Sequence, residues 1–158
     1  MSARPSRFRI GLRVDDVEAA QHFYEGLGFA HAATIPDPHG RPVLSILEGQ
    51  GVTLIVDALE GLPFPASDRE RNIRRGPRGL GVVVGLIVDD LEASYRYFQK
   101  AGCEITSEPR DEPWGDRVFS ALDPFGFEWE ISHPIKGDGP DDGAAATHEA
   151  WFGASPGS

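Results

Sequence analysis

Residues 12–20 read LRVDDVEAA, and residues 86–94 read LIVDDLEAS, so one stretch of sequence occurs twice. In both copies a strand-like apolar run ends in two aspartates, and a helix-like run follows. Two copies of one supersecondary unit predict a pseudo-twofold fold, with the equivalent strands facing each other across a shared cleft. The correspondence continues outside this stretch, with Gly11 matching Gly85, Tyr24 matching Phe98 and Gly28 matching Gly102.

Each copy predicts one strand, one helix and then three strands. The first strand is expected over residues 7–14. Asp15 and Glu18 form a capping-box-like pair that starts the first helix, and Asp89 and Glu92 repeat that pair. The alternating apolar runs that follow predict strands at 29–34, 42–48 and 52–57 in the first copy, and at 103–108, 117–122 and 127–132 in the second.

This order predicts an α+β fold, in which tandem βαβββ modules form a curved, cleft-enclosing mixed sheet with helices on the outside. We expect a single domain over residues 1–134, with module one at 7–57, a linker at 58–79 and module two at 80–133. Residues 135–158 are rich in Gly, Ala and Asp and are expected to form a flexible acidic tail. Within it, Trp151 and Phe152 could dock on the domain or on a neighbouring chain.

Composition limits the class of protein. The 158 residues are 40% hydrophobic and 25% charged, which is typical of a globular chain. The single cysteine, Cys103, excludes an internal disulfide. The net charge of −10 disfavours nucleic acid as a partner and mildly favours a cationic ligand. No apolar run approaches the about 18 residues of a membrane span, so no membrane association is expected and a cytoplasmic location is the default.

The repeat and its flanking motifs resemble the vicinal oxygen chelate superfamily, which includes glyoxalase I, extradiol dioxygenases and bleomycin-resistance proteins. The resemblance covers about residues 7–133. It is carried by the strand, Val-Asp-Asp and helix start in both copies and by three further stretches: Phe23-Tyr24 with Leu27-Gly28-Phe29, residues 114–117 (WGDR), and residues 123–130 (DPFGFEWE).

In the enzymes of this superfamily, four strand residues bind one divalent metal, which acts as a Lewis acid on the substrate. The resemblance places these positions at Arg9, Ile55, Val83 and Glu130. A guanidinium and two aliphatic side chains cannot ligate a metal, and one carboxylate cannot hold a divalent ion alone. Metal-dependent catalysis by the usual route is therefore not expected, and no cofactor is predicted.

A cleft without a metal resembles the bleomycin-resistance type, which sequesters a drug, often as a homodimer. The implied function is a metal-free small-molecule binding protein whose ligand is an aromatic or cationic antibiotic. Trp114 is either a stacking surface for a planar ligand or a loop anchor, and Trp129, beside Glu130, is expected in the core on the opposite face. The candidate ligand-binding residues are Arg9, Ile55, Phe64, Val83, Trp114, Arg117, Phe119 and Glu130.

Two other functions stay open at this point. One is an enzyme: either a glyoxalase- or dioxygenase-like metalloenzyme with misaligned ligands, or a metal-free isomerase or lyase with Glu130 as general base and Arg9 stabilising an oxyanion. The other is an interaction module without a small-molecule cleft. Pairing of the modules within one chain or between two chains is also undecided.

Overall fold

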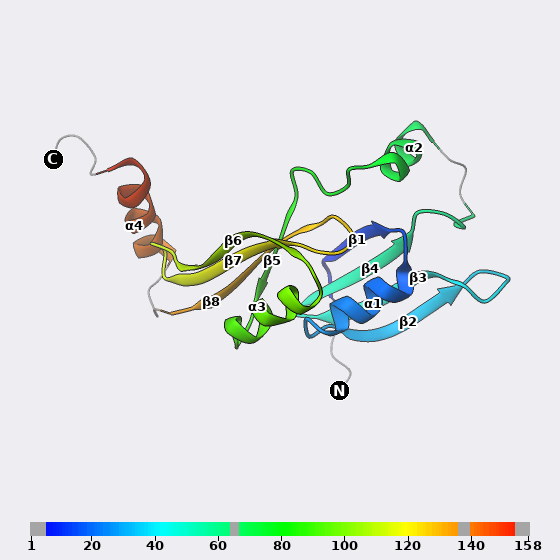
Figure 1. The fold of residues 1–158 in the computed structure, drawn as a ribbon, viewed down its shortest axis with the longest axis horizontal. Coiled ribbons are helices and arrows are strands. Elements are labelled where there is room, and N and C mark those ends of the chain that lie inside the picture. Colours follow the sequence, from blue (N-terminus) through cyan, green and yellow to red (C-terminus); the bar gives the residue numbers. More distant parts are fainter. Residues whose placement is uncertain (1–5, 64–66, 136–139, 154–158) are drawn as a thin grey trace. The chain divides into compact units, whose positions relative to one another are not determined.

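The computed structural model describes residues 6–63, 67–135 and 140–153. The chain divides into two compact units, Met1–Leu80 and Gly81–Ser158. Each unit contains one copy of the sequence repeat, and each has its own sheet and its own helix packed against that sheet (Figure 1).

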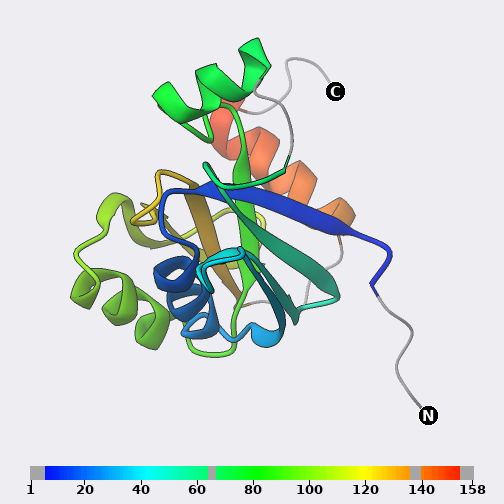
Figure 2. The ribbon, with the colours of Figure 1, turned by 90° about the vertical axis from the view of Figure 1, so that its right-hand side faces the viewer.

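The first unit has the predicted βαβββ order, and its four strands form one mixed sheet of order β1-β4-β3-β2. Strand β1 pairs with β4 in parallel, and the other pairs are antiparallel. Helix α1 lies against one face of this sheet (Figure 2). The elements are β1 (Arg9–Val14), α1 (Val17–Glu25), β2 (Ala30–Pro36), β3 (Pro42–Gly49), β4 (Val52–Ala58) and a further helix, α2 (Asp68–Arg75).

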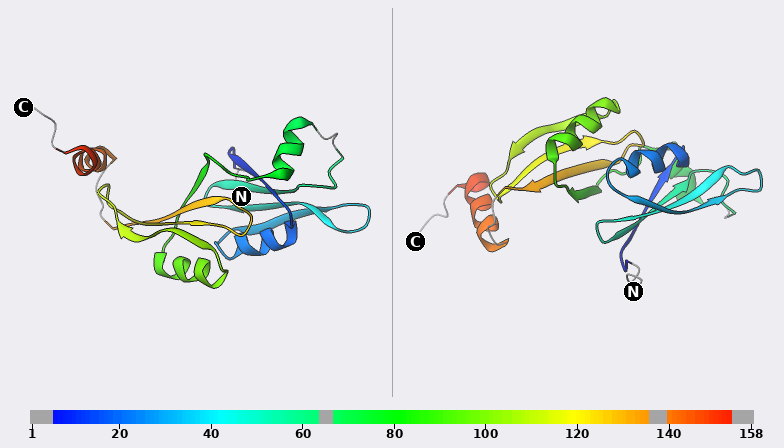
Figure 3. Two further views of the ribbon diagram at one scale, coloured as in Figure 1. Left: turned by 45° about the horizontal axis from the view of Figure 1, so that its top comes forward. Right: turned by 90° about the horizontal axis from the view of Figure 1, so that it is seen from below.

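The second unit repeats this topology, with the strand order β5-β8-β7-β6 and a parallel β5–β8 pair. Helix α3 lies on one side of the strands, and α4 lies near their end (Figure 3, right). The α+β class and the tandem βαβββ modules are thereby confirmed. The elements are β5 (Val83–Ile87), α3 (Leu91–Lys100), β6 (Glu104–Asp111), β7 (Asp116–Leu122), β8 (Glu128–Pro134) and α4 (Pro140–Phe152).

Each core lies between a sheet and its helix. In the first unit Val14, Tyr24 and Val56 are completely buried, and in the second Phe98 and Trp129 are. The prediction that Trp129 belongs to the core is confirmed. Its indole N–H donates to Oδ2 of the buried Asp123 at 2.9 Å. Oδ1 of the same carboxylate accepts the backbone N–H groups of Phe125 and Phe127, so Asp123 holds the turn that leads into β8.

The two repeat helices begin one residue later than predicted. The N-cap is Asp16 rather than Asp15, and its carboxylate accepts the backbone N–H of Ala19 at 2.9 Å. Asp90 caps α3 in the same way through Ala93. The predicted capping box is absent, because the residue three positions after each cap is alanine and not glutamate.

Two helices lie in segments where none was expected. Helix α2 lies in the predicted linker, where Ser67 caps its N-terminus and the Arg13 Nη1 on β1 donates to Glu70 at 2.7 Å. Helix α4 lies in the predicted tail. Among the described residues, no helix is long and apolar enough to cross a membrane.

Replacing Asp16 or Asp90 with alanine is expected to lower the free energy of unfolding by about 1 kcal/mol, because each change orphans a first-turn N–H group. Asp15→Ala and Asp89→Ala are the matched controls. Urea unfolding followed by circular dichroism measures both. Equal losses in the caps and in their controls would contradict the assignment of Asp16 and Asp90.

Candidate functional site

The face of the first sheet that α1 does not cover carries two of the predicted site residues. Leu12 and Val14 on β1, and Leu54 and Val56 on β4, are buried. Because side chains alternate along a strand, Arg9 and Ile55 share the opposite face. Ile55 pairs with Gly11, which is the next residue after Arg9 on this face of β1. Ile55 and Arg9 are therefore neighbours on that face. Arg9 is exposed and Ile55 is partly buried.

The second sheet repeats this arrangement. Gly85 pairs with Glu130, and Val83 lies on the same face as Glu130. Val83 is 53% exposed, although it is aliphatic, and Glu130 is exposed as well. We call these two surfaces the open faces of the sheets. The sequence repeat therefore located pairs of residues that share a face within each unit.

The side chains at these four positions do not fit a divalent metal. Arg9 has no lone pair to donate at neutral pH, and Ile55 and Val83 have no donor atom. Glu130 alone offers a carboxylate. Across the part of the chain that the structure describes, no group of three or more His, Cys, Asp and Glu residues could hold a metal ion.

Three other predicted ligand-binding residues lie in different surroundings. Phe119 is completely buried on the face that α3 covers, where its ring packs edge-on against Tyr95 and Phe98. Phe119 is therefore a core residue, and its side chain does not lie on the open face. Arg117 donates to Glu92 at 3.1 Å and to Asp111 at 2.9 Å, and these ion pairs tie β7 to α3 and β6. Phe64 lies outside the described residues.

Trp114 is held by the loop before β7 and by α4. Its indole N–H donates to Asp116 at 3.1 Å, and its ring meets Trp151 edge-on with centroids 6.1 Å apart. Gly143 of α4 packs so closely that an added Cβ would lie 3.0 Å from the Trp114 carbonyl oxygen. The loop-anchor role considered for Trp114 accounts for these contacts.

A charged network on the first open face was not predicted from the sequence. Arg13 of β1 lies 3.6 Å from Asp57 of β4 and 2.7 Å from Glu70 of α2. Burial raises the pKa of the Asp57 carboxyl, the Arg13 guanidinium opposes that rise, and the Glu70 charge adds to it. Because side chains alternate along β1 and β4, Arg13 and Asp57 lie on one face. Their link to α2 could not be predicted in the same way, because it depends on the path of the linker between the modules.

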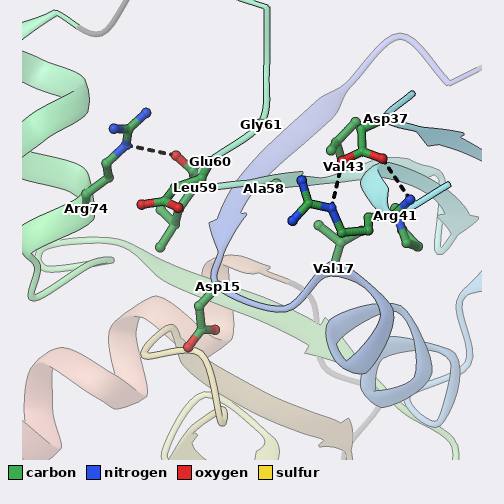
Figure 4. Close-up of a pocket in the computed structure, with 11 residues that line it drawn as sticks. Asp15, Val17, Asp37, Arg41, Val43, Ala58, Leu59, Glu60, Gly61 and Arg74 are labelled. Atoms are coloured by element: carbon green, nitrogen blue, oxygen red, sulfur yellow. Dashed lines mark hydrogen bonds and ion pairs between the residues drawn. The ribbon is translucent and has the colours of Figure 1, made fainter. Parts of the chain in front are cut away.

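The first unit also contains a cavity of about 470 Å³ beyond the C-terminal ends of β1 and β4 (Figure 4). Its wall combines a buried apolar part with charged groups from four separate segments. It is lined by Asp15, Val17, Asp37, Arg41, Pro42, Val43, Ala58, Leu59, Glu60, Gly61 and Arg74. None of these residues was predicted to form a site, because they come together only through the hairpin turn between β2 and β3 and through α2.

Asp37 organises one wall of this cavity. Its carboxylate accepts the backbone N–H groups of Arg41 at 2.9 Å and His39 at 2.8 Å, and the Arg41 Nε at 2.8 Å. The backbone hydrogen bond from Arg41 is the main cause of a lowered Asp37 pKa, and the Arg41 side chain lowers it further. The turn thus fixes the Arg41 side chain at the edge of the cavity.

Comparisons with known proteins agree with this fold. The sequence model of the Glyoxalase/Bleomycin resistance protein/Dioxygenase superfamily matches residues 7–131. The chain therefore belongs to this superfamily, as the sequence resemblance implied.

Among curated proteins, the uncharacterized protein Mb0911c of Mycobacterium bovis is 27% identical over 129 residues, covering 79% of this chain and 81% of its own. Among solved structures, TioX from Micromonospora sp. ML1 has a TM-score of 0.63 at 21% identity, covering 82% of this chain and 99% of its own. TnmS3, described as an antibiotic binding protein from Streptomyces sp. CB03234, has a TM-score of 0.55 at 25% identity, covering 85% and 97%.

Asp37→Asn and Asp57→Asn are expected to change the pH dependence of stability in opposite directions. The lowered pKa of Asp37 gives stability that is present above its ordinary pKa of 3.8 and lost as the pH falls through the folded-state pKa. The raised pKa of Asp57 means that ionisation costs stability as the pH rises from 3.8 through its folded-state value. As the pH rises, the Asp37 variant should therefore lose stability relative to the wild type, and the Asp57 variant should gain it. Urea titrations between about pH 3 and about pH 7 test this, and slopes of the same sign would contradict it.

Gly143→Val is expected to detach α4 from Trp114, because even one added carbon meets the Trp114 backbone. Ala145→Val, at an exposed position of the same helix, is the control for placing a β-branched side chain in α4, and it is the stricter one because valine is a poorer helix former than alanine but a better one than glycine. Limited proteolysis within residues 140–153 and the tryptophan emission maximum measure the change. Unchanged emission in the Gly143 variant would show that this contact does not hold the helix.

Proposed function

We propose that this chain is a metal-free small-molecule binding protein that sequesters an antibiotic-type ligand on the open faces of its sheets. The observation that carries the proposal is the set of side chains at Arg9, Ile55, Val83 and Glu130. Three of these four positions cannot donate to a metal. The 25% identity to TnmS3, an antibiotic binding protein, supports a binding role for the same fold.

The open faces have the composition of a binding surface. Small-molecule sites combine apolar walls with a few placed polar groups. Ile55 and Val83 supply apolar surface, while Arg9 and Glu130 supply one charge of each sign. On β5, Val83 is 53% exposed and Ile87 is 61% exposed, and apolar side chains grouped in this way favour contact with a ligand or a second chain.

The charges suggest the chemistry of the ligand. Among the described residues, the side chains of Arg9 and Glu130 make no hydrogen bond or ion pair within the chain. On the first open face Arg9 is therefore available to a carbonyl oxygen of a planar ligand, and on the second open face Glu130 is available to a cationic nitrogen. We further propose that the protein acts as a cytoplasmic homodimer, in which a second copy covers part of the exposed apolar surface of β5.

The unpaired Glu130 favours a second candidate function, a metal-free isomerase or lyase. As a general base, Glu130 would take a proton from a carbon next to a carbonyl group of the substrate. In an isomerase the proton returns to a neighbouring carbon. In this case Glu130→Gln would abolish turnover while retaining binding, whereas a pure binding protein has no turnover to lose.

A thermal-shift screen of the purified chain tests the proposed function against DNA-damaging antibiotics, aromatic polyketides, and Zn²⁺, Ni²⁺ and Mn²⁺. An antibiotic at about 100 times its dissociation constant stabilises the folded state by about 2.7 kcal/mol. We expect such a shift with an antibiotic and none with the metals. Elemental analysis showing one tightly bound divalent ion per chain would overturn the metal-free assignment.

Two substitutions on the open faces then locate the ligand. Arg9→Gln and Glu130→Gln are each expected to weaken binding of the identified antibiotic by about tenfold, the loss of one charge-assisted hydrogen bond. Arg96→Gln on α3 and Glu149→Gln on α4, both exposed positions, are the matched controls. If the two pairs of variants bind equally well, the ligand does not use the open faces.

A further inference from the structure

We propose that the cavity beyond the ends of β1 and β4 is a second binding site, and that it takes a small zwitterionic molecule with an apolar body. The cavity lies within the first unit and contains none of the four open-face residues. The inference is therefore independent of the function proposed above, and each can fail without the other.

The apolar part of the cavity wall belongs to the core of the first unit. Val17 is 3% exposed, and Val43 and Ala58 are each 8% exposed, so these side chains are packed into the core of the unit. They come from α1, β3 and β4, three elements that are fixed to one another through the sheet and its helix. A preformed apolar surface of this kind suits the hydrocarbon part of a ligand.

Two guanidinium groups border the cavity with their outer nitrogens free. The Arg41 Nε donates to Asp37 at 2.8 Å, and the Arg74 Nε donates to the Leu59 carbonyl at 3.0 Å. Among the described residues, the terminal nitrogens of both side chains have no partner. Figure 4 shows the Arg41 side chain extending from the turn toward the end of β4, with its Nε bonded to Asp37. A guanidinium whose Nε is already held presents its two outer N–H groups as a fork for a carboxylate.

Two carboxylates on the same cavity wall also lack partners in the described part of the chain. Asp16, and not Asp15, caps α1; Asp15 is a lining residue at the end of β1, and its carboxylate makes no hydrogen bond or ion pair to a described residue. Glu60 follows the end of β4 and makes no ion pair or hydrogen bond to a described side chain. These two groups can accept hydrogen bonds from an ammonium group.

The lining carries charges of both signs, which favours a zwitterion over a simple anion or cation. The ion pair between Asp37 and Arg41 compensates one carboxylate and one guanidinium of the lining, although the outer N–H groups of Arg41 stay free to donate. A ligand with only a negative charge would meet the unpaired Asp15 and Glu60, and one with only a positive charge would meet the unpaired Arg74. A molecule with a carboxylate and an ammonium group can satisfy both sets, as in an α-amino acid with a hydrophobic side chain.

Three matched probes test the charge requirement on the full chain. Phenylalanine carries both charges, phenylalanine amide only the positive one, and N-acetylphenylalanine only the negative one. Titration followed by ¹H–¹⁵N NMR should show phenylalanine shifting the amide signals of Val17, Val43 and Ala58, with at least about tenfold tighter binding than either derivative. Equal binding of all three, no perturbation at millimolar concentrations, or perturbations confined to other residues would overturn the proposal.

Variants separate the role of each charge. Arg41→Lys keeps the charge but removes the fork, and it should weaken phenylalanine binding by about tenfold. Asp15→Asn and Glu60→Gln should each weaken it, while leaving the weaker binding of N-acetylphenylalanine unchanged or improved. Arg96→Gln is the control for overall charge, and urea unfolding confirms that each variant is folded. Phenylalanine binding that is unchanged in Arg41→Lys, Asp15→Asn and Glu60→Gln would assign the probe to a different place and overturn the proposed site.

Discussion

The parallel pairing of the first and last strand in each module is the constraint on which the other features depend. Parallel strands need a crossover, and each module makes it with one helix and a two-stranded hairpin between β1 and β4, or between β5 and β8. The helix covers one face of the sheet. Because successive side chains of a strand point to opposite faces, every strand residue lies either on the core side or on the open face. That assignment places Arg9 with Ile55, and Val83 with Glu130.

The same pairing creates the cavity at the end of the first sheet. Parallel strands end at one edge, so Asp15 and Leu59 leave β1 and β4 side by side, joined by the hydrogen bond from the Leu59 N–H to the Val14 carbonyl at 2.9 Å. Ligands in sheets with parallel strands commonly bind outside the carboxyl ends of those strands. Here α2 and the turn between β2 and β3 add Arg74 and Arg41 to that edge.

The sequence predicted the repeated architecture well, because both copies contain strong periodic signals. All the predicted strands are present, and Trp129 lies in the core as its position beside Glu130 required. The helix starts were shifted by one residue, because two consecutive aspartates offer two possible caps and sequence alone does not choose between them. Phe119 was misplaced for a related reason: its face depends on the pairing of β7 with β8, in which it lies opposite Ile131.

Helices α2 and α4 escaped prediction because tertiary contacts hold them. Helix α2 has no buried residue, and it is bound to the sheet through Glu70 and Arg74. A helix without an apolar stripe gives no periodic signal. In α4, Gly143 and Trp151 make the described contacts with Trp114. Glycine has a low helix propensity, so Gly143 argues against a helix in this segment when only the sequence is considered. The cavity could not be predicted from the sequence for the same reason, because Arg74 lines it only when α2 forms.

The charges on the open faces limit which groups can bind there. A divalent ion would be the largest local charge on an open face, and its ligands would have to be neutral or anionic. The Arg9 guanidinium can contact other groups only as a donor of hydrogen bonds and as a partner in ion pairs. Replacing Arg9 with a neutral ligand such as histidine would not create a metal site by itself, because Ile55 on the same face would still supply no donor atom. The chemistry of this chain therefore follows from several positions acting together, with Glu130 as the one residue that a metal site and a metal-free site could both use.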